Sequence, residues 1–182
     1  MATITPPTAW PLVPPGIAGY PKVKGVPYSP DGARALLAEA GYPGGQGLGT
    51  LELIYNTSEN LKKIAEAVAY MLKKELNVNI LPSNMEWKVL LGKVEQLDYT
   101  FARGSWYGDY TDPNTFLDMF LTGGGNNNTG WSDRAYDSLV ALANRTGDDP
   151  ARRIDRQAQD VVDHVRVRPE GQFPTRAGLQ AG

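Results

Sequence analysis

Two carboxylates and three aromatic rings lie within one short segment of the chain, from Trp106 to Asp112, with the sequence WYGDYTD. Two carboxyl groups about 5–5.5 Å apart serve as the acid and the nucleophile of a retaining glycosidase. A single carboxylate among rings favours another chemistry, a charge-assisted contact with the ammonium group of a bound molecule. The choice between these two functions depends on whether Asp109 and Asp112 are both free to act.

Asp112 has a structural role that its neighbour predicts. It directly precedes Pro113, and proline is favoured in the first turn of a helix, where its missing amide hydrogen would have no partner. An aspartate just before such a helix accepts hydrogen bonds from the unpaired amides. We therefore expect Asp112 to cap a helix, which makes a hydrolase using Asp109 and Asp112 the less favoured alternative. Asp109 has no comparable structural role, and we expect it to contact a ligand.

Trp106 and Trp87 are the candidate aromatic contacts. Trp106 follows a predicted strand and shares its loop with Asp109, so we expect it to contact the ligand. Trp87 stands at helical spacing from Leu90 and Val94, a pattern that is typical of core packing. Both a core position and a ligand pocket stay open for Trp87.

Arg103 is the candidate cation. It shares one face of a predicted strand with Tyr99 and Phe101, because alternate residues of a strand point the same way. A buried guanidinium needs a partner. That partner is either a carboxylate of the chain, Asp98 or Asp109, which is the commoner outcome, or a ligand.

The composition excludes several other classes of function. The chain has 182 residues, a net charge of −2 and no cysteine, so we expect no nucleic-acid partner and no thiolate metal site. The single histidine, His164, has no second ligand at a suitable spacing, and we expect neither a metal nor a cofactor. The glycine-rich run Gly44–Gly49 lacks the Lys-Ser/Thr of a phosphate loop and precedes a strand instead of following one.

Hydrophobic periodicity predicts that strands and helices alternate along the chain. Strands are expected at residues 51–55, 78–81 and 99–102, the second ended by Pro82. Helices are expected at 33–40 (capped by Ser29 and ended by Gly41), after the turn 56–58, around 87–94, from Pro113, after the cap Ser132, and from Asp149. This order predicts an α/β fold in which helices flank a layered sheet. We divide the chain into an extended Pro-rich arm (1–28), an α/β ligand-binding lobe (29–148), and an unmatched helix with a disordered tail (149–182).

Several separated motifs resemble one known family. The runs LELIYNTSENLKKIAEAVAYMLKKELNVNI, EWK, ARGSWYGDYTDPNTFLDMF and NNNTGWSDRAYDSL are similar, in this order, to the second lobe of the oligopeptide-binding proteins of ABC importers. These are the family 5 extracytoplasmic solute-binding proteins, and the resemblance covers residues 12–145. It implies one lobe of a type II periplasmic-binding-protein-like fold without catalytic activity.

The resemblance also implies roles for the four candidate residues. Asp109 would pair with the α-ammonium of an extended peptide, and Trp106 and Trp87 would line pockets for its side chains. Arg103 would meet the peptide's C-terminal carboxylate. The implied partners are this peptide and an ABC permease at the membrane, and the intact protein would be a periplasmic or extracytoplasmic monomer. The same family fold tuned for another solute, an oligosaccharide or a metal chelate, is the main alternative.

The chain departs from the family pattern in several places. Leu61 and Val94 stand where family members can carry a histidine and another basic residue, which weakens any preference for the shortest peptides. The first lobe is missing, and so is the apolar segment expected after Ala143. Residues 152–182 resemble nothing in the family. We therefore expect a truncated or frameshifted reading frame.

Two further expectations concern where the chain resides and how well it binds. The N-terminus has no basic segment followed by an apolar one, so no signal peptide is expected and the chain as written would stay in the cytoplasm. Because half of the cleft is missing, we also expect the isolated lobe to bind peptides weakly or not at all.

Overall fold

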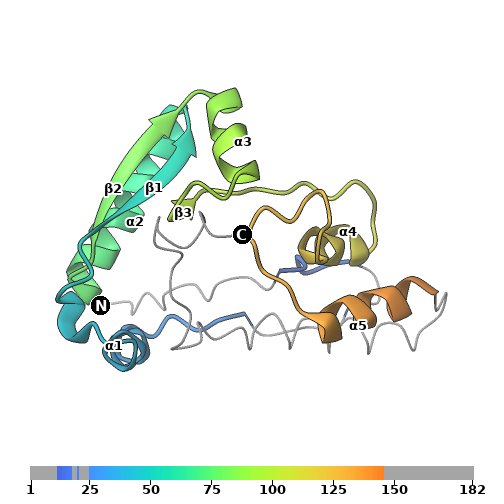
Figure 1. The fold of residues 1–182 in the computed structure, drawn as a ribbon, viewed down its shortest axis with the longest axis horizontal. Helices are drawn as coiled ribbons and strands as arrows, with labels where there is room; N and C mark the ends of the chain where they lie inside the picture. Colours follow the sequence, from blue (N-terminus) through green and yellow to red (C-terminus); the bar gives the residue numbers. More distant parts are fainter. Residues whose placement is uncertain (1–11, 18–19, 21–24, 146–182) are drawn as a thin grey trace, which may run out of the picture.

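The computed structural model describes residues 12–17, 20 and 25–145 of the chain (Figure 1). His164, the helix expected from Asp149 and the expected disordered tail lie outside these residues, and so does most of the N-terminal arm. Within the described part, the expected α/β architecture is confirmed as a parallel sheet with flanking helices.

The sheet has three parallel strands in the order β2-β1-β3. The strands are β1 (Thr50–Asn56), β2 (Asn79–Met85) and β3 (Phe101–Ala102). Two helices make the connections, α2 (Glu59–Leu76) between β1 and β2 and α3 (Trp87–Glu95) between β2 and β3. Because parallel strands need such crossover helices, the alternating pattern of the sequence is sufficient to predict this arrangement.

The buried residues of this part come from the central strand (Ile54 and Tyr55), from the two connecting helices (Ala65 and Leu90), and from Val78 in the link between α2 and β2. The longest helix, α2, ends at Asn77, which adopts the left-handed conformation with φ 57°. The side chain of Asn77 donates a hydrogen bond to the carbonyl of Gly44 at 3.0 Å and thereby ties the end of α2 to the loop before β1.

The second strand passes through Pro82, where the sequence predicted that it would stop. Pro82 pairs with Leu53, and β2 continues to Met85. The prediction was wrong because β2 lies at the edge of the described sheet, with β1 on one side only. An edge strand tolerates proline, since the missing amide hydrogen can face away from the neighbouring strand.

The third strand is shorter than expected. Only Phe101 and Ala102 pair with β1, whereas residues 99–102 were predicted. Tyr99 serves another purpose, because its hydroxyl donates a hydrogen bond to the carbonyl of Asn128 in the loop before the last described helix. This contact connects the start of β3 to the loop that follows α4.

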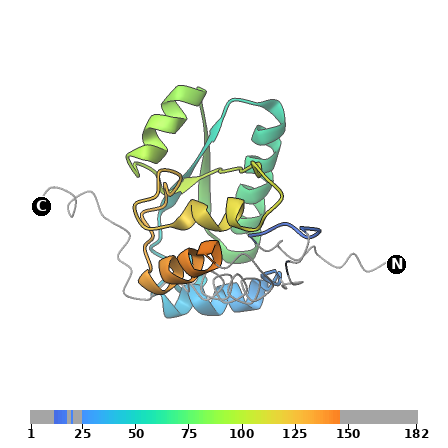
Figure 2. The same ribbon diagram turned by 90° about the vertical axis from the view of Figure 1, so that its right-hand side faces the viewer.

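A second buried cluster lies beside the sheet and consists of Val13, Leu117, Tyr136 and Val140. Its helical residues come from α4 (Asn114–Leu117) and α5 (Arg134–Arg145), and Phe120 of η2 (Asp118–Phe120) packs against it. The remaining helices, α1 (Pro30–Glu39) and η1 (Pro43–Gly45), precede β1 and contribute no residue to this cluster. Figure 2 shows α4 and α5 lying next to each other. The hydroxyl of Tyr136 donates to the carbonyl of Leu117, and the Trp131 ring meets the Tyr136 ring edge-on at 5.0 Å.

Three local details refine the predicted boundaries. The expected cap Ser29 accepts a hydrogen bond from the amide of Gly32, and Gly41 has a φ of 91°, so both ends of α1 are confirmed. The cap of α5 is Asp133 and not Ser132, because the carboxylate of Asp133 accepts bonds from the first free amides at 2.7 and 2.9 Å. Val13 belongs to the expected extended arm, yet it is fully buried in the second cluster.

The second cluster should determine much of the stability of the lobe. Leu117 is 0% exposed, and replacing a buried leucine by alanine costs about 2–5 kcal/mol of unfolding free energy. We expect Leu117→Ala to show a loss in this range in urea unfolding followed by circular dichroism. Leu36→Ala is the matched control, because Leu36 is 58% exposed in α1. Equal losses in the two variants would contradict the assignment of this core.

Candidate ligand-binding site at the carboxyl ends of the strands

The candidate residues follow the carboxyl ends of the parallel strands. Trp87 begins α3 and is separated from β2 by one residue, Arg103 comes directly after β3, and Asn56 is the last residue of β1. Figure 1 shows the arrowheads of β1 and β2 pointing toward α3. In open α/β sheets, ligands bind outside this edge. The fold therefore brings two of the four predicted site residues to the edge where such sites form.

The Trp106–Asp112 loop is fixed in place by α4. The amide of Asp109 donates to the hydroxyl of Thr115 at 3.0 Å, and Thr115 is only 1% exposed. Gly108 packs so closely that a Cβ there would lie 3.0 Å from the ring of Phe116 and from the methyl group of Thr115. The loop backbone is thus held at Gly108 and at the amide of Asp109, the residue that carries the candidate carboxylate.

The carboxylate of Asp109 is exposed and has no hydrogen-bond or ion-pair partner among the described residues. Its charge acts on Asp118, whose pKa is raised first by partial burial and second by repulsion from Asp109. The two carboxylates therefore share a region of negative potential. A bound ammonium group would relieve this repulsion.

The Trp106 ring is half-buried, and its polar atom lacks a partner. The indole Nε1 is shielded from solvent and finds no acceptor among the residues that the structure describes. A buried donor without an acceptor costs about 1–3 kcal/mol. A ligand carbonyl placed against this nitrogen would remove that cost, which makes Trp106 suitable both for ring contact and for polar contact.

Trp87 is not a core residue. It is 53% exposed at the start of α3, whereas Leu90, one turn later, is 2% exposed. The helix begins at Trp87 because Glu86 caps it, accepting the amide of Lys88 at 2.8 Å. The core interpretation of its spacing was therefore wrong, and the ring is open to a ligand.

Arg103 extends the pairing of β3 by one residue. Its amide donates to the carbonyl of Ile54 at 2.9 Å. The expected structural ion pair is not formed, since no carboxylate of the described chain lies within ion-pairing distance of the guanidinium, and Asp98 pairs with Lys93 at 2.7 Å instead. The half-buried Arg103 is therefore a candidate for a ligand carboxylate.

Asp112 is occupied as a helix cap. Its carboxylate accepts the amide of Asn114 at 2.9 Å, and its carbonyl accepts the amide of Thr115 at 3.3 Å. The predicted cap is confirmed, although α4 begins at Asn114, after Pro113. This removes the second free carboxylate that the hydrolase alternative requires.

Sequence reasoning missed Asn56. It was assigned only to the turn before α2, but its Oδ1 is buried at the end of β1 without a donor among the described residues. Its position after a predicted strand could have identified it, because an asparagine that ends a parallel strand lies at the edge of the sheet where ligands bind. We add Asn56 to the candidate site.

Comparison with known proteins identifies the family. The sequence profile of the bacterial extracellular solute-binding proteins, family 5 (middle part), matches residues 5–128. The chain belongs to this family. The resemblance noted from the motifs is thereby confirmed.

The related family 5 proteins are several times longer than the matched segment. The chain is 41% identical over 120 residues to the periplasmic oligopeptide-binding protein of Salmonella typhimurium, covering 66% of this chain and 22% of that protein. It is 39% identical over 130 residues to the periplasmic murein peptide-binding protein of Escherichia coli, covering 71% and 24%. The chain thus spans less than a quarter of either relative's length.

Solved structures confirm the family 5 fold. The Escherichia coli murein tripeptide-binding protein superposes with a TM-score of 0.77 at 33% identity, covering 86% of this chain and 32% of that one. Within the described residues, no group of three or more metal-ligating side chains occurs, and no helix is long and apolar enough to cross a membrane.

The repulsion between the two carboxylates can be measured. Because the charge of Asp109 raises the pKa of Asp118, we expect Asp109→Asn to lower that pKa toward its usual value, as followed by carboxyl carbon NMR during a pH titration. Glu66→Gln, on α2, is the control and should leave it unchanged. An unchanged Asp118 titration in Asp109→Asn would contradict the proximity of the two groups.

The raised pKa of Asp118 also predicts how the unfolding free energy depends on pH. A raised pKa in the folded state means that the folded chain binds the proton more tightly than the unfolded chain. The protonated Asp118 therefore adds to the free energy of unfolding. This stabilisation is fully present below the pKa of Asp118 in the unfolded chain and is lost as the pH rises through its pKa in the folded chain. Asp109→Asn should bring the folded-state pKa of Asp118 closer to its unfolded-state pKa, and so narrow the pH range over which this stabilisation is lost.

The role of Asp112 is separately testable. We expect Asp112→Ala to lower the unfolding free energy by about 0.5–2 kcal/mol through loss of the cap, measured by urea unfolding. Asp112→Asn keeps an accepting oxygen and should retain most of the stability. A catalytic role would give the opposite result, with normal stability and lost glycoside hydrolysis in Asp112→Ala.

Proposed function

We propose that the chain is the peptide-contacting lobe of a solute-binding protein that serves an ABC importer and has no catalytic role. One observation carries the proposal. The carboxylate of Asp109 is exposed, unpaired within the described chain, and carried by a backbone that Thr115 fixes in the same loop as the half-buried Trp106. Such an arrangement suits a ligand that presents an ammonium group next to an apolar or amide-containing part.

Each site residue has a role in this proposal. Asp109 pairs with the α-ammonium of the peptide, and the indole nitrogen of Trp106 donates to a peptide carbonyl. The rings of Trp106 and Trp87 provide broad contact surfaces that accept many side chains. Arg103 meets the C-terminal carboxylate of a peptide of suitable length, and Asn56 contributes a carbonyl oxygen to a peptide amide.

The relatives support a peptide as the ligand. Relatives at 38–41% identity are named oligopeptide-, dipeptide- and murein peptide-binding proteins. More distant ones are named for deoxycholate and for heme, at 32% and 31% identity. A heme is a metal chelate, so the alternative solute class is represented in the family. The unpaired Asp109 favours the peptide, because a free peptide offers an α-ammonium group that this carboxylate can pair with.

The wider context follows from the family and is part of the proposal. A closed cleft would strengthen the pairing at Asp109 by excluding water. The closed protein, a monomer outside the cytoplasm, would deliver its peptide to a membrane permease. Because the chain spans only part of its relatives, we propose that it retains peptides weakly when alone.

A two-way comparison tests the role of Asp109. We expect trialanine to perturb the NMR spectrum of the chain at millimolar concentrations and N-acetyl-trialanine to bind about two- to fivefold more weakly, the ratio for one exposed ion pair of about 0.5–1 kcal/mol. In Asp109→Asn the two peptides should bind equally. Glu66→Gln removes the same charge from α2 and should keep the preference.

Three results would overturn parts of the proposal. An acetylation effect that persists in Asp109→Asn would assign the ammonium to another group. Micromolar binding by isothermal titration would show that one lobe suffices. Binding of heme or of an oligosaccharide in preference to trialanine would replace the peptide by the alternative solute.

A further inference from the structure

A segment near the start of the chain, residues 12–17, packs against α4. Its sequence is LVPPGI, and Val13 is 0% exposed. Val13 belongs to the same buried cluster as Leu117 of α4, and Leu12 and Ile17 pack against that cluster. Figure 1 shows this blue segment beside α4. We call residues 12–17 the N-terminal strap.

The N-terminal strap is a rigid turn. Pro14 and Pro15 follow Val13, and each proline fixes its own φ. Gly16 completes the turn with a φ of 99°, a value that residues with a Cβ rarely adopt. A Cβ at Gly16 would meet no described atom within 4 Å, so the turn needs this glycine for its backbone conformation and not for space. The turn brings both Val13 and Ile17 to the cluster.

Helix α4 depends on this packing. It consists of the four residues Asn114–Leu117, and a single turn of helix is too short to persist alone in water. The hydroxyl of Tyr136 donates to the carbonyl of Leu117, and Val13 lies in the same buried cluster as these two residues. A change at Val13 therefore acts on the packing that holds α4.

Two contacts lead from α4 to the Asp109 loop. The hydroxyl of Thr115 accepts the amide of Asp109 at 3.0 Å. The ring of Phe116 packs against the buried cluster and would lie 3.0 Å from a Cβ on Gly108. Gly108 and Asp109 are consecutive, so both contacts hold the backbone that carries the candidate carboxylate.

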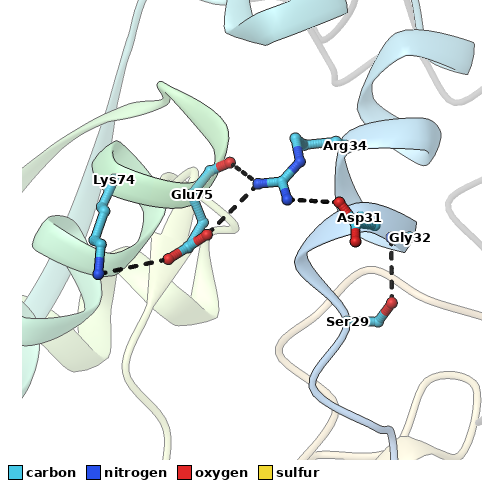
Figure 3. Close-up of polar contacts among 6 residues, drawn as sticks. All are labelled: Ser29, Asp31, Gly32, Arg34, Lys74 and Glu75. Carbon is cyan, nitrogen blue, oxygen red and sulfur yellow. Dashed lines mark hydrogen bonds and ion pairs between the residues drawn. The ribbon is translucent and has the colours of Figure 1, made fainter.

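Helix α1 gives α4 no comparable support. It contributes no residue to the cluster and is fixed to α2 instead. Arg34 of α1 donates to the carbonyl of Glu75 at 2.7 Å and lies 3.5 Å from its carboxylate, while Asp31 holds the other guanidinium nitrogen at 2.7 Å (Figure 3). Among the described residues before β1, the cluster and its packed neighbours include only strap residues and Tyr20.

We propose that Val13 is a positioning residue for the ammonium contact at Asp109 and that the N-terminal strap acts on this contact through α4. The inference rests on the ligand-binding role proposed for Asp109. With Val13 in the cluster, α4 stays in place and holds the loop backbone. A cavity at position 13 lets α4 move and releases the amide of Asp109 from Thr115.

Hydrogen exchange of the Asp109 amide, followed by NMR, tests the coupling without any peptide. We expect Val13→Ala to accelerate this exchange by about two- to tenfold, the lower part of the range for residues coupled through packed neighbours. The slowest amides of β1 report global unfolding and correct for lost overall stability. Val78→Ala is the matched control, because Val78 is 5% exposed and lies outside the cluster. It should leave the Asp109 amide unchanged.

A second pair of variants tests the strap without removing a buried atom. Gly16→Ala disfavours the positive φ of the turn and should accelerate the same exchange. Gly47→Ala is its control, because Gly47 has a φ of 82° and equally open surroundings but lies in the loop before β1. We expect it to have no effect at Asp109. If Val13→Ala does not fold, this pair decides the question.

Thr115→Val tests the route. This variant keeps the shape of the side chain and removes the hydroxyl that accepts the Asp109 amide. The amide then has no partner to lose, so adding Val13→Ala to Thr115→Val should accelerate exchange little further. A full additional acceleration would show that Val13 does not act through α4.

The comparison of trialanine with N-acetyl-trialanine tests the effect on binding. Val13→Ala should bring the ratio of the two affinities closer to one, and Val78→Ala should keep it. Unchanged exchange in both strap variants would overturn the inference, and so would equal acceleration in the controls or a full preference in Val13→Ala despite faster exchange. If the unchanged chain shows no preference, the ligand proposed for Asp109 fails, and the exchange measurements alone decide whether Val13 positions the loop.

Discussion

The parallel pairing of β1 with its two neighbours is the constraint on which the candidate site depends. Pairing in one direction requires that the chain return through α2 and α3, and it places the ends of all three strands at one edge. Asn56, Trp87 and Arg103, which are far apart in sequence, meet that edge for this reason alone. The loop with Asp109 follows from the same edge, because it is the continuation of β3.

The elements with strong local signals were predictable from the sequence. Helix α1 has a serine cap and a terminal glycine, α2 has a long apolar period, and Asp112 stands before a proline; each signal arises within a few residues. Two predictions were wrong for different reasons. Pro82 is accepted because β2 lies at an edge of the described sheet, and no local pattern shows that position. Asp133 takes the cap expected of Ser132, because serine and aspartate are both good caps and the sequence places them side by side.

The candidate site also has features that the sequence predicted and features that it could not. The sequence selected Asp109, Trp106, Trp87 and Arg103 by residue type and by family resemblance. It could not decide between core and surface for Trp87, because helical spacing does not tell which turn faces the sheet. It also could not show that Asp98 pairs with Lys93 and leaves Arg103 without that partner. Asn56 was missed because turn-forming and ligand-contacting asparagines look alike before a strand is placed in a sheet.

The close packing of Gly108 has a consequence for how this lobe could diversify. A Cβ at this position would lie 3.0 Å from the side chains of Phe116 and Thr115, so one of them would have to shift to admit it. The backbone directly before Asp109 is therefore closely packed against α4. Its neighbour Tyr107 is 88% exposed, and Tyr110 is 50% exposed with a hydroxyl that accepts a hydrogen bond from Asn114 at 3.1 Å. Under the role proposed for Asp109, an exchange of the Tyr107 side chain would alter the surface offered to a ligand and leave the position of the carboxylate unchanged.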